Sequence, residues 1–100
     1  MGLNSLVERF KERLGIHIFA KLTIYGNCDS CMVDFGGQKR EYQNLHDAEQ
    51  VVRDFDLSGE EVVIKTGEIE YNGHMYHPMR HIHLSNFRTW LKNRGVVVIK

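Results

Sequence analysis

Histidines and cysteines are the residues of this chain whose types and spacing suit chemistry. The stretch NGHMYHPMRHIHLSNF, residues 72–87, holds four of the six histidines: His74, His77, His81 and His83. An imidazole can bind a metal ion, transfer a proton near neutral pH, or add positive charge to a surface as the pH falls. Which of these applies depends on where the side chains point, and therefore on the elements that carry them.

A zinc site is one interpretation. Cys28 and Cys31 lie three positions apart, and two thiolates at this spacing can bind Zn²⁺ together with two imidazoles. His74 and His77 are the candidates for the remaining two ligands, provided that the ends of two hairpins meet. The 42 residues between Cys31 and His74 differ from the short ligand spacing of zinc fingers. We therefore favour no metal and no other cofactor, and keep zinc as an alternative.

Acid–base catalysis is a second interpretation. If residues 79–84 form a strand, His81 and His83 share one face, with their imidazoles about 7 Å apart. Two such groups with a nearby Arg or Lys suffice for metal-independent RNA cleavage, in which one imidazole removes a 2′-hydroxyl proton and the other protonates the leaving oxygen. The sequence contains no G-x-S-x-G, P-loop, G-x-G-x-x-G or H-E-x-x-H motif. We therefore predict a protein that is not an enzyme, and rank a small ribonuclease as the third choice.

Charge is distributed unevenly along a chain whose formal net charge is zero. Residues 44–73 carry two Lys/Arg against eight Asp/Glu, whereas residues 74–100 carry five Lys/Arg and no Asp or Glu. Such a split can mark an electrostatic recognition face. It can also arise from two segments that pack together and neutralise each other.

The basic segment 74–100 is our first candidate for a partner-binding surface. We predict that its contact residues are Arg80, His81, His83, Arg88, Lys92 and Arg94. A protein is the first choice of partner. Nucleic acid is the second, because cations interleaved with aromatic rings also suit phosphate pairing and base stacking. The acidic residues 47–70 are the alternative protein-binding face.

Hydrophobic periodicity predicts the elements that position these residues. Helical spacing predicts helices at 3–14, at 45–55 after an N-cap at Asn44, and at 86–94 after an N-cap at Ser85. Alternation and turn residues predict strands at 16–25, 31–35, 38–43, 62–65, 67–71, 74–84 with an interruption at Pro78, and 96–100.

These elements predict a single α+β domain over residues 1–100, in the order α-β-β-β-α-β-β-β-α-β. We expect a mainly antiparallel sheet with the helices packed on one face. Residues 31–55 and 67–94 share the pattern of a hairpin followed by a helix, which suggests a weak ββα repeat. One hundred residues are enough to bury one core.

Small size and bipolar charge favour a non-enzymatic binding protein. We expect a stoichiometric protein-binding regulator or inhibitor of the anti-defence (anti-CRISPR-like) kind that phages and mobile elements use, acting on a nucleic-acid-handling host complex. The alternative is a nucleic-acid-binding domain, with or without zinc. This step is an analogy from size and motif content, not from a residue match.

Segment composition also bears on location and assembly. No apolar stretch approaches the length of a membrane span, and the first residues lack the order of a signal peptide. We therefore expect a cytoplasmic protein with no membrane partner. The β-branched run at 96–100 must pair within its own sheet or extend it in a homodimer, and we favour the monomer.

Overall fold

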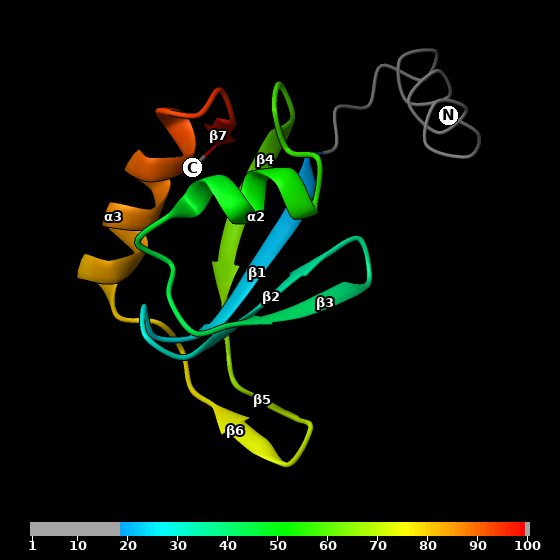
Figure 1. Cartoon of the computed structure of the whole chain (residues 1–100), viewed down its shortest axis with the longest axis vertical. Helices are drawn as coiled ribbons and strands as arrows, with labels where there is room; N and C mark the ends of the chain where they lie inside the picture. Colours follow the sequence, from blue (N-terminus) through cyan, green and yellow to red (C-terminus); the bar gives the residue numbers. More distant parts are fainter. Residues whose placement is uncertain (1–18, 100) are drawn as a thin grey trace.

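A computed structural model describes residues 19–99 of the chain (Figure 1). The helix predicted at 3–14, the start of the first predicted strand and Lys100 lie outside the described residues. The observed elements are β1 (Ala20–Gly26), β2 (Cys31–Phe35), β3 (Gln38–Tyr42), α2 (Ala48–Asp54), β4 (Glu61–Thr66), β5 (Ile69–Tyr71), β6 (His74–Tyr76), α3 (His81–Lys92) and β7 (Val97–Ile99).

A five-stranded sheet with the order β3-β2-β1-β4-β7 forms the centre of this α+β domain. β2 is antiparallel to β1 and to β3, whereas β4 is parallel to β1 and β7 is parallel to β4. Parallel neighbours need crossover connections, and the segments that contain α2 and α3 supply them. The prediction of a mainly antiparallel sheet is therefore wrong, because the sheet is mixed.

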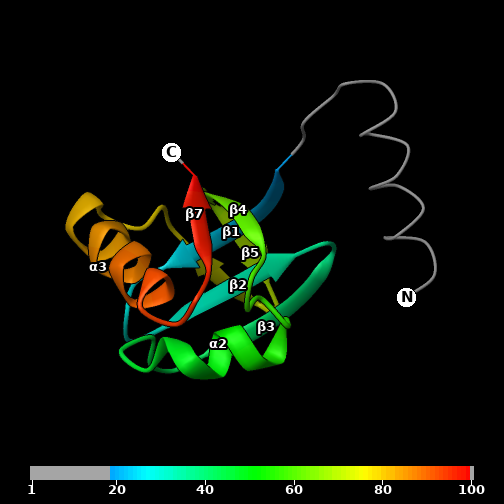
Figure 2. The same cartoon turned by 90° about the horizontal axis from the view of Figure 1, so that it is seen from above.

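One hydrophobic core joins the sheet to both helices. Alternating side chains of β1, including Leu22 and Ile24, are buried in the same cluster as Val51 of α2 and Phe87 of α3. Both helices therefore cover the same face of the sheet (Figure 2). Within the described part of the chain, neither helix is long and apolar enough to cross a membrane.

The β5–β6 hairpin stands outside this sheet and projects from its lower end (Figure 1). Its turn is Asn72-Gly73, whose φ angles of 51° and 79° fit a type I′ turn, which this dipeptide favours. Asn72 Nδ2 donates to Glu41 Oε1 at 2.8 Å, and the Gly26 N–H donates to the His77 carbonyl at 2.6 Å. These bonds hold the hairpin against β3 and the end of β1.

The predicted strand at 74–84 is the largest error. It ends at Tyr76, and α3 begins at His81 with Arg80 as its N-cap, so the predicted cap at Ser85 is wrong. Leu84, Phe87 and Leu91 are all buried and recur at helical spacing. Leu84 fits this stripe as well as it fits an alternating strand, because a short apolar run does not distinguish the two periods.

The start of α2 also differs from the prediction. The Asp47 carboxylate accepts the Glu49 N–H at 3.1 Å and caps the helix, whereas Asn44 Oδ1 accepts the His46 N–H at 2.8 Å in the preceding turn. Asp and Asn suit both roles, so residue type did not decide between them. The predicted apolar stripe is confirmed as buried: Leu45, Ala48, Val51, Val52 and Phe55.

Candidate partner-binding surface

α3 separates the predicted contact residues into two flanks. At 100° per residue, His81, Arg88 and Lys92 lie along one flank, and His83 lies on the other. His81 and His83 therefore point about 160° apart around the helix axis. The prediction that they share one face is wrong, and the imidazole pair required for the ribonuclease alternative is not formed by these two residues.

The flank with His83 faces α2. The Trp90 ring on this flank lies 5.3 Å from the His46 ring, measured between centroids. Arg94 donates from Nη1 to the Trp90 carbonyl at 3.0 Å, and its Nη2 lies 3.8 Å from Asp47 Oδ1. These contacts tie α2 to α3 and satisfy a carbonyl in the last turn of α3. Arg94 thus has a structural role in the fold.

The opposite flank carries cations without such partners. Among residues 19–99, no ion pair involves Arg80, His81, Arg88 or Lys92. Arg88 is half-buried, and its Nε is enclosed without a hydrogen-bond partner in this part of the chain. Arg80, His81 and Lys92 are exposed. The charge of this flank therefore remains available to another molecule.

Large apolar side chains accompany these cations at the lower end of the molecule. The exposed large hydrophobic residues of the described chain are Met75 (50%), Ile82 (63%) and Val97 (47%). Along the sequence, Met75 of β6 and Ile82 of α3 lie on either side of Arg80. We refer to the exposed side chains of residues 74–82 as the hairpin–helix surface: His74, Met75, His77, Pro78, Arg80, His81 and Ile82.

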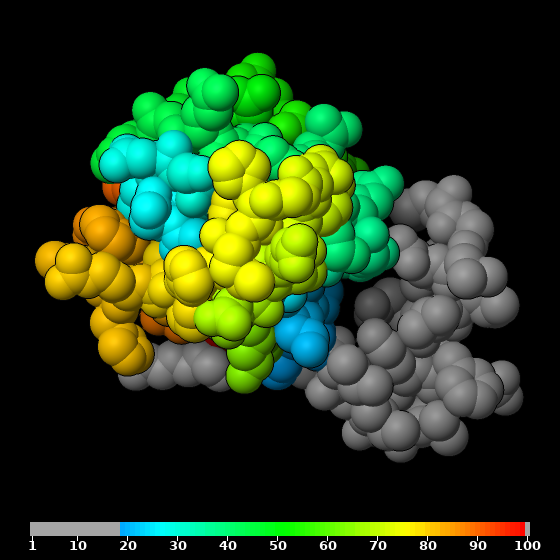
Figure 3. Space-filling view, turned by 90° about the horizontal axis from the view of Figure 1, so that it is seen from below, coloured from blue at the N-terminus to red at the C-terminus, as the bar shows by residue number. Residues whose placement is uncertain are grey.

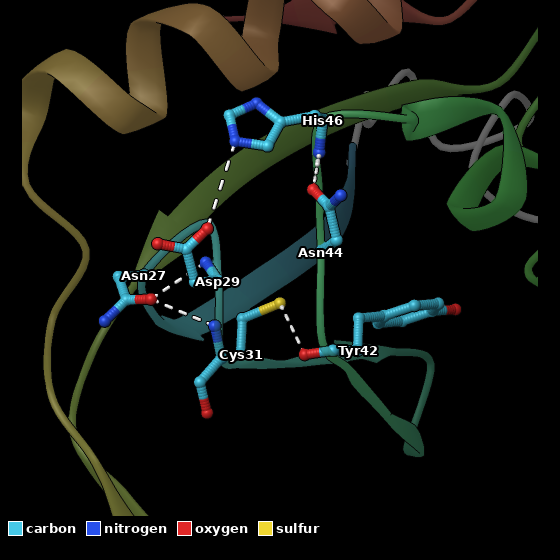
Figure 4. A network of polar contacts seen from close by, with 7 residues as sticks. Asn27, Asp29, Cys31, Tyr42, Asn44 and His46 are labelled. Carbon is cyan, nitrogen blue, oxygen red and sulfur yellow. Dashed lines mark hydrogen bonds and ion pairs between the residues drawn. The ribbon is translucent and has the colours of Figure 1, made fainter.

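A groove of about 250 Å³ lies within this surface. The turn after β1 forms one wall, through Gly26, Asn27 and Ser30, and the segment from His74 to Arg80 forms the other. Asn27 Oδ1 accepts the N–H groups of Asp29 and Ser30 at 2.9 Å each, which orders the turn (Figure 4). None of the described carboxylates lines the groove.

The acidic and basic segments neutralise each other only in part. The Asp47–Arg94 pair is one contact between them, and His77 Nδ1 lies 3.3 Å from Glu68 Oε2 in a second, exposed pair. Exposed pairs of this kind contribute at most about 1 kcal/mol. Both readings of the charge pattern therefore apply, to different residues: Arg94 and His77 are paired, whereas Arg80 and the free flank of α3 are not.

The acidic residues 47–70 do not gather on one face. Asp54 accepts a hydrogen bond from the Tyr42 hydroxyl at 2.8 Å beside α2. Glu70 lies on β5, in the hairpin at the far end of the molecule (Figure 1). The acidic residues 47–70 are therefore divided between α2, β4 and the separate β5–β6 hairpin.

The zinc candidates are placed in different surroundings. Cys28 and Cys31 are buried, with 4% and 0% of their surface exposed, whereas His74 and His77 are exposed. Burial raises the pKa of the Cys31 thiol to about 12 and also raises the pKa of Cys28, which opposes the thiolate form that zinc requires. Cys31 Sγ donates to the Tyr42 carbonyl at 3.6 Å (Figure 4). Within residues 19–99, no three His, Cys, Asp or Glu side chains form a group that could hold a metal ion.

Met75 and Ile82 of this surface and Asn27 of the groove wall are absent from the predicted contact residues. A strand at 79–84 would place Ile82 on the same face as Arg80 and Leu84, whereas the helical phase of α3 separates Ile82 from the buried Leu84 and turns it outward. Met75 follows a turn in a short hairpin, so its exposure depends on the hairpin lying outside the main sheet. Asn27 could be recognised as a turn residue, but its position opposite Arg80 is a tertiary feature.

Comparison with known proteins found no family model, no curated protein and no solved structure that matches the chain. The functional proposal therefore rests on the residues described above. The hairpin–helix surface is the part of the described chain that combines unpaired cations, exposed apolar side chains and a groove.

Proposed function

We propose that this protein is a small non-enzymatic binding protein that acts as a stoichiometric regulator or inhibitor of another protein. Its contact surface is the hairpin–helix surface, continued along α3 by Arg88 and Lys92. The observation that carries the proposal is the exposure of Met75 and Ile82 on either side of the unpaired Arg80. Methionine and arginine are enriched in protein interfaces, where apolar anchors lose water and arginine pairs with the partner.

The partner that we propose is a nucleic-acid-handling complex of the host, and the protein is then an anti-defence (anti-CRISPR-like) regulator in the cytoplasm. The support is the positive sign of the surface, because residues 74–100 carry five Lys/Arg and no Asp or Glu. Enzymes that cut or copy nucleic acids hold their metal ions with carboxylates, and acidic surfaces of that kind are complementary to an unpaired arginine beside imidazoles.

The test is affinity capture from the native host with three forms of the full chain. A tag other than polyhistidine avoids adventitious metal at the exposed imidazoles. We expect the parent and Val97→Ser to retain one protein at equimolar yield, and the Met75→Ser, Ile82→Ser double variant to retain at least tenfold less. Val97→Ser is the matched control because Val97 is the third exposed apolar residue and lies on β7. If all three forms retain equal amounts of the partner protein, the proposal is wrong.

Nucleic-acid binding is the second candidate function, and the unpaired flank of α3 favours it. Arg88 and Lys92 lie one helical turn apart on that flank, and residues 74–100 contain no Asp or Glu. Binding to a labelled duplex should then weaken with salt at a log–log slope of about −0.9 for each phosphate contact. If neither a duplex nor a single strand is retained at low salt, this candidate fails.

A further inference from the structure

We propose that the groove between the turn after β1 and the β6–α3 segment binds an acidic segment of the partner protein, with one carboxylate seated against Arg80. The inference rests on the proposed function and adds the chemistry of the partner segment. The observations that support this inference are the polar groups of the two groove walls and the apolar side chains beside them.

The groove walls present hydrogen-bond donors and a permanent cation. Because Asn27 Oδ1 is already an acceptor for two backbone N–H groups, the Nδ2 group is the part of this side chain left for a ligand. Ser30 adds a hydroxyl on the same wall, and Arg80 stands on the opposite wall. A guanidinium can bind a carboxylate through two parallel N–H donors. The groove therefore suits an anionic acceptor.

The surroundings of the groove favour a polypeptide as the source of that anion. Met75 and Pro78 belong to the same wall as Arg80, and Met75 is half exposed. An acidic residue seated at Arg80 would place the neighbouring side chains of its own segment on these apolar groups. The cyan turn at 27–30 lies beside the yellow hairpin in Figure 3, so the groove opens at the molecular surface.

Nucleic acid fits the same groove less well. Binding to a nucleic acid gains affinity from several phosphate contacts spread along the backbone. Arg80 is the only Lys or Arg among the described residues that line the groove, and His77 in the same wall is paired with Glu68. One permanent cation between apolar side chains matches one carboxylate in a mixed acidic and apolar segment.

The experiment uses the full ¹⁵N-labelled chain and a defined probe. The probe is a short acetylated peptide in which glutamate alternates with serine around one leucine, and its control replaces each glutamate with glutamine. We expect saturable amide shifts at Asn27, Ser30, residues 75–77 and residues 79–80 with the glutamate peptide. Arg80→Glu should weaken this binding at least tenfold, because it replaces the cation with a like charge.

The matched control is Arg40→Glu, which reverses an exposed arginine on β3, away from the groove walls. It should leave the dissociation constant within twofold of the parent value. Equal binding of the glutamate and glutamine peptides, unchanged binding by Arg80→Glu, or no saturable shift at all would overturn the inference. A DNA duplex that shifts the same amides more strongly than the peptide would also overturn it.

Failure of the groove and failure of the proposed function give different results. If the captured partner depends on Met75 and Ile82 but binds Arg80→Glu as tightly as the parent, the groove inference fails and the function stands. If no stoichiometric partner is captured although the glutamate peptide binds with the expected Arg80 dependence, the proposed regulator function fails and the acid-binding groove stands.

Discussion

The chain contains two hairpin–helix units that begin from the same local pattern and end in different roles. In the first, β2 and β3 belong to the five-stranded sheet, and α2 covers the core. In the second, β5 and β6 form a separate hairpin, and the segment between β6 and α3 is exposed. The weak repeat at 31–55 and 67–94 therefore describes local order and not equivalent structure.

The difference between the two units lies in what their side chains contact. Cys31 and Val33 of the first hairpin are fully buried beneath the helices. His74 and Met75 of the second hairpin are exposed, and Tyr76 is the buried residue of its strand. The first unit therefore contributes both its hairpin and its helix to the core, whereas the second reaches the core through α3 and Met79 and presents most of its hairpin to solvent.

The largest expected effect tests the helical phase of α3. Phe87→Ala removes a fully buried ring and should lower the free energy of unfolding by about 3–5 kcal/mol. Ile82→Ala, at a site that is 63% exposed, should change it by less than about 0.5 kcal/mol. Urea denaturation of both variants measures the difference. A comparable loss for Ile82→Ala would contradict the phase of the helix and the exposure of the binding surface.

The next effect concerns the buried thiol of the first unit. Burial raises the pKa of Cys31 from 9.0 to about 12, so the unfolded chain loses this proton at a lower pH than the folded chain. Stability should therefore be unaffected by this group below about pH 9. Above that value the free energy of unfolding should fall by up to about 1.4 kcal/mol per pH unit until the folded thiol also ionises.

Urea denaturation of the parent and of Cys31→Ala between pH 8 and pH 10.5 isolates this contribution. Tyr42 and Tyr76, whose pKa values burial also raises, remain in both forms and cancel in the comparison. The alanine variant should be less stable at pH 8 but should lose less stability as the pH rises. If the free energy of unfolding falls equally with pH in the two forms, the Cys31 thiol is not buried in the folded protein.

A smaller effect compares the turns of the two hairpins. Gly37 and Gly73 have φ angles of 87° and 79°, and a Cβ at either would meet no atom within 4 Å. An alanine at either position therefore adds backbone strain of about 1–2 kcal/mol without a clash. Gly37→Ala should lower global stability, because its hairpin belongs to the main sheet. Gly73→Ala should instead increase amide exchange in β5 and β6 with little change in the urea midpoint. Equal shifts of the urea midpoint would contradict the separation of the second hairpin.

The smallest effect concerns assembly. β7 pairs with β4 at one end of the sheet, and Val97 is 47% exposed. We predict a monomer in light scattering and no change of mass for Val97→Lys. One edge of β7 is already hydrogen-bonded to β4, and a strand of three residues leaves little unpaired backbone on its other edge for a second copy. A dimer that appears with rising protein concentration and disappears in Val97→Lys would establish the homodimer alternative.

The sequence predicted those parts of the fold that depend on neighbours in the chain. The alternation of Leu22 and Ile24 and the Asn72-Gly73 turn are confirmed, since backbone preference and side-chain period are local properties. The parallel pairing of β4 with β1 was not predicted, because it joins strands separated by a hairpin and a helix. Tertiary pairing of this kind leaves no local signal.

The candidate site follows the same division. The basic character of residues 74–100 was evident from composition, and Arg80 and His81 are exposed as a contact surface requires. Which of these residues share a surface was not evident, because a strand places His81 and His83 on one face whereas the helix α3 places them on different flanks. An error in one element thus changed which residues share a surface, although His81 and His83 had both been singled out.

The binding site is tested most directly by hydrogen exchange of the full chain alone and bound to its captured partner. We expect protection in the second unit, at residues 74–82 and along the flank of α3 that contains Arg88 and Lys92. The exposed strand β3 of the first unit should exchange at the same rate in both states. Protection confined to β3 and α2, with residues 74–82 unchanged, would contradict the assignment of the hairpin–helix surface as the binding site.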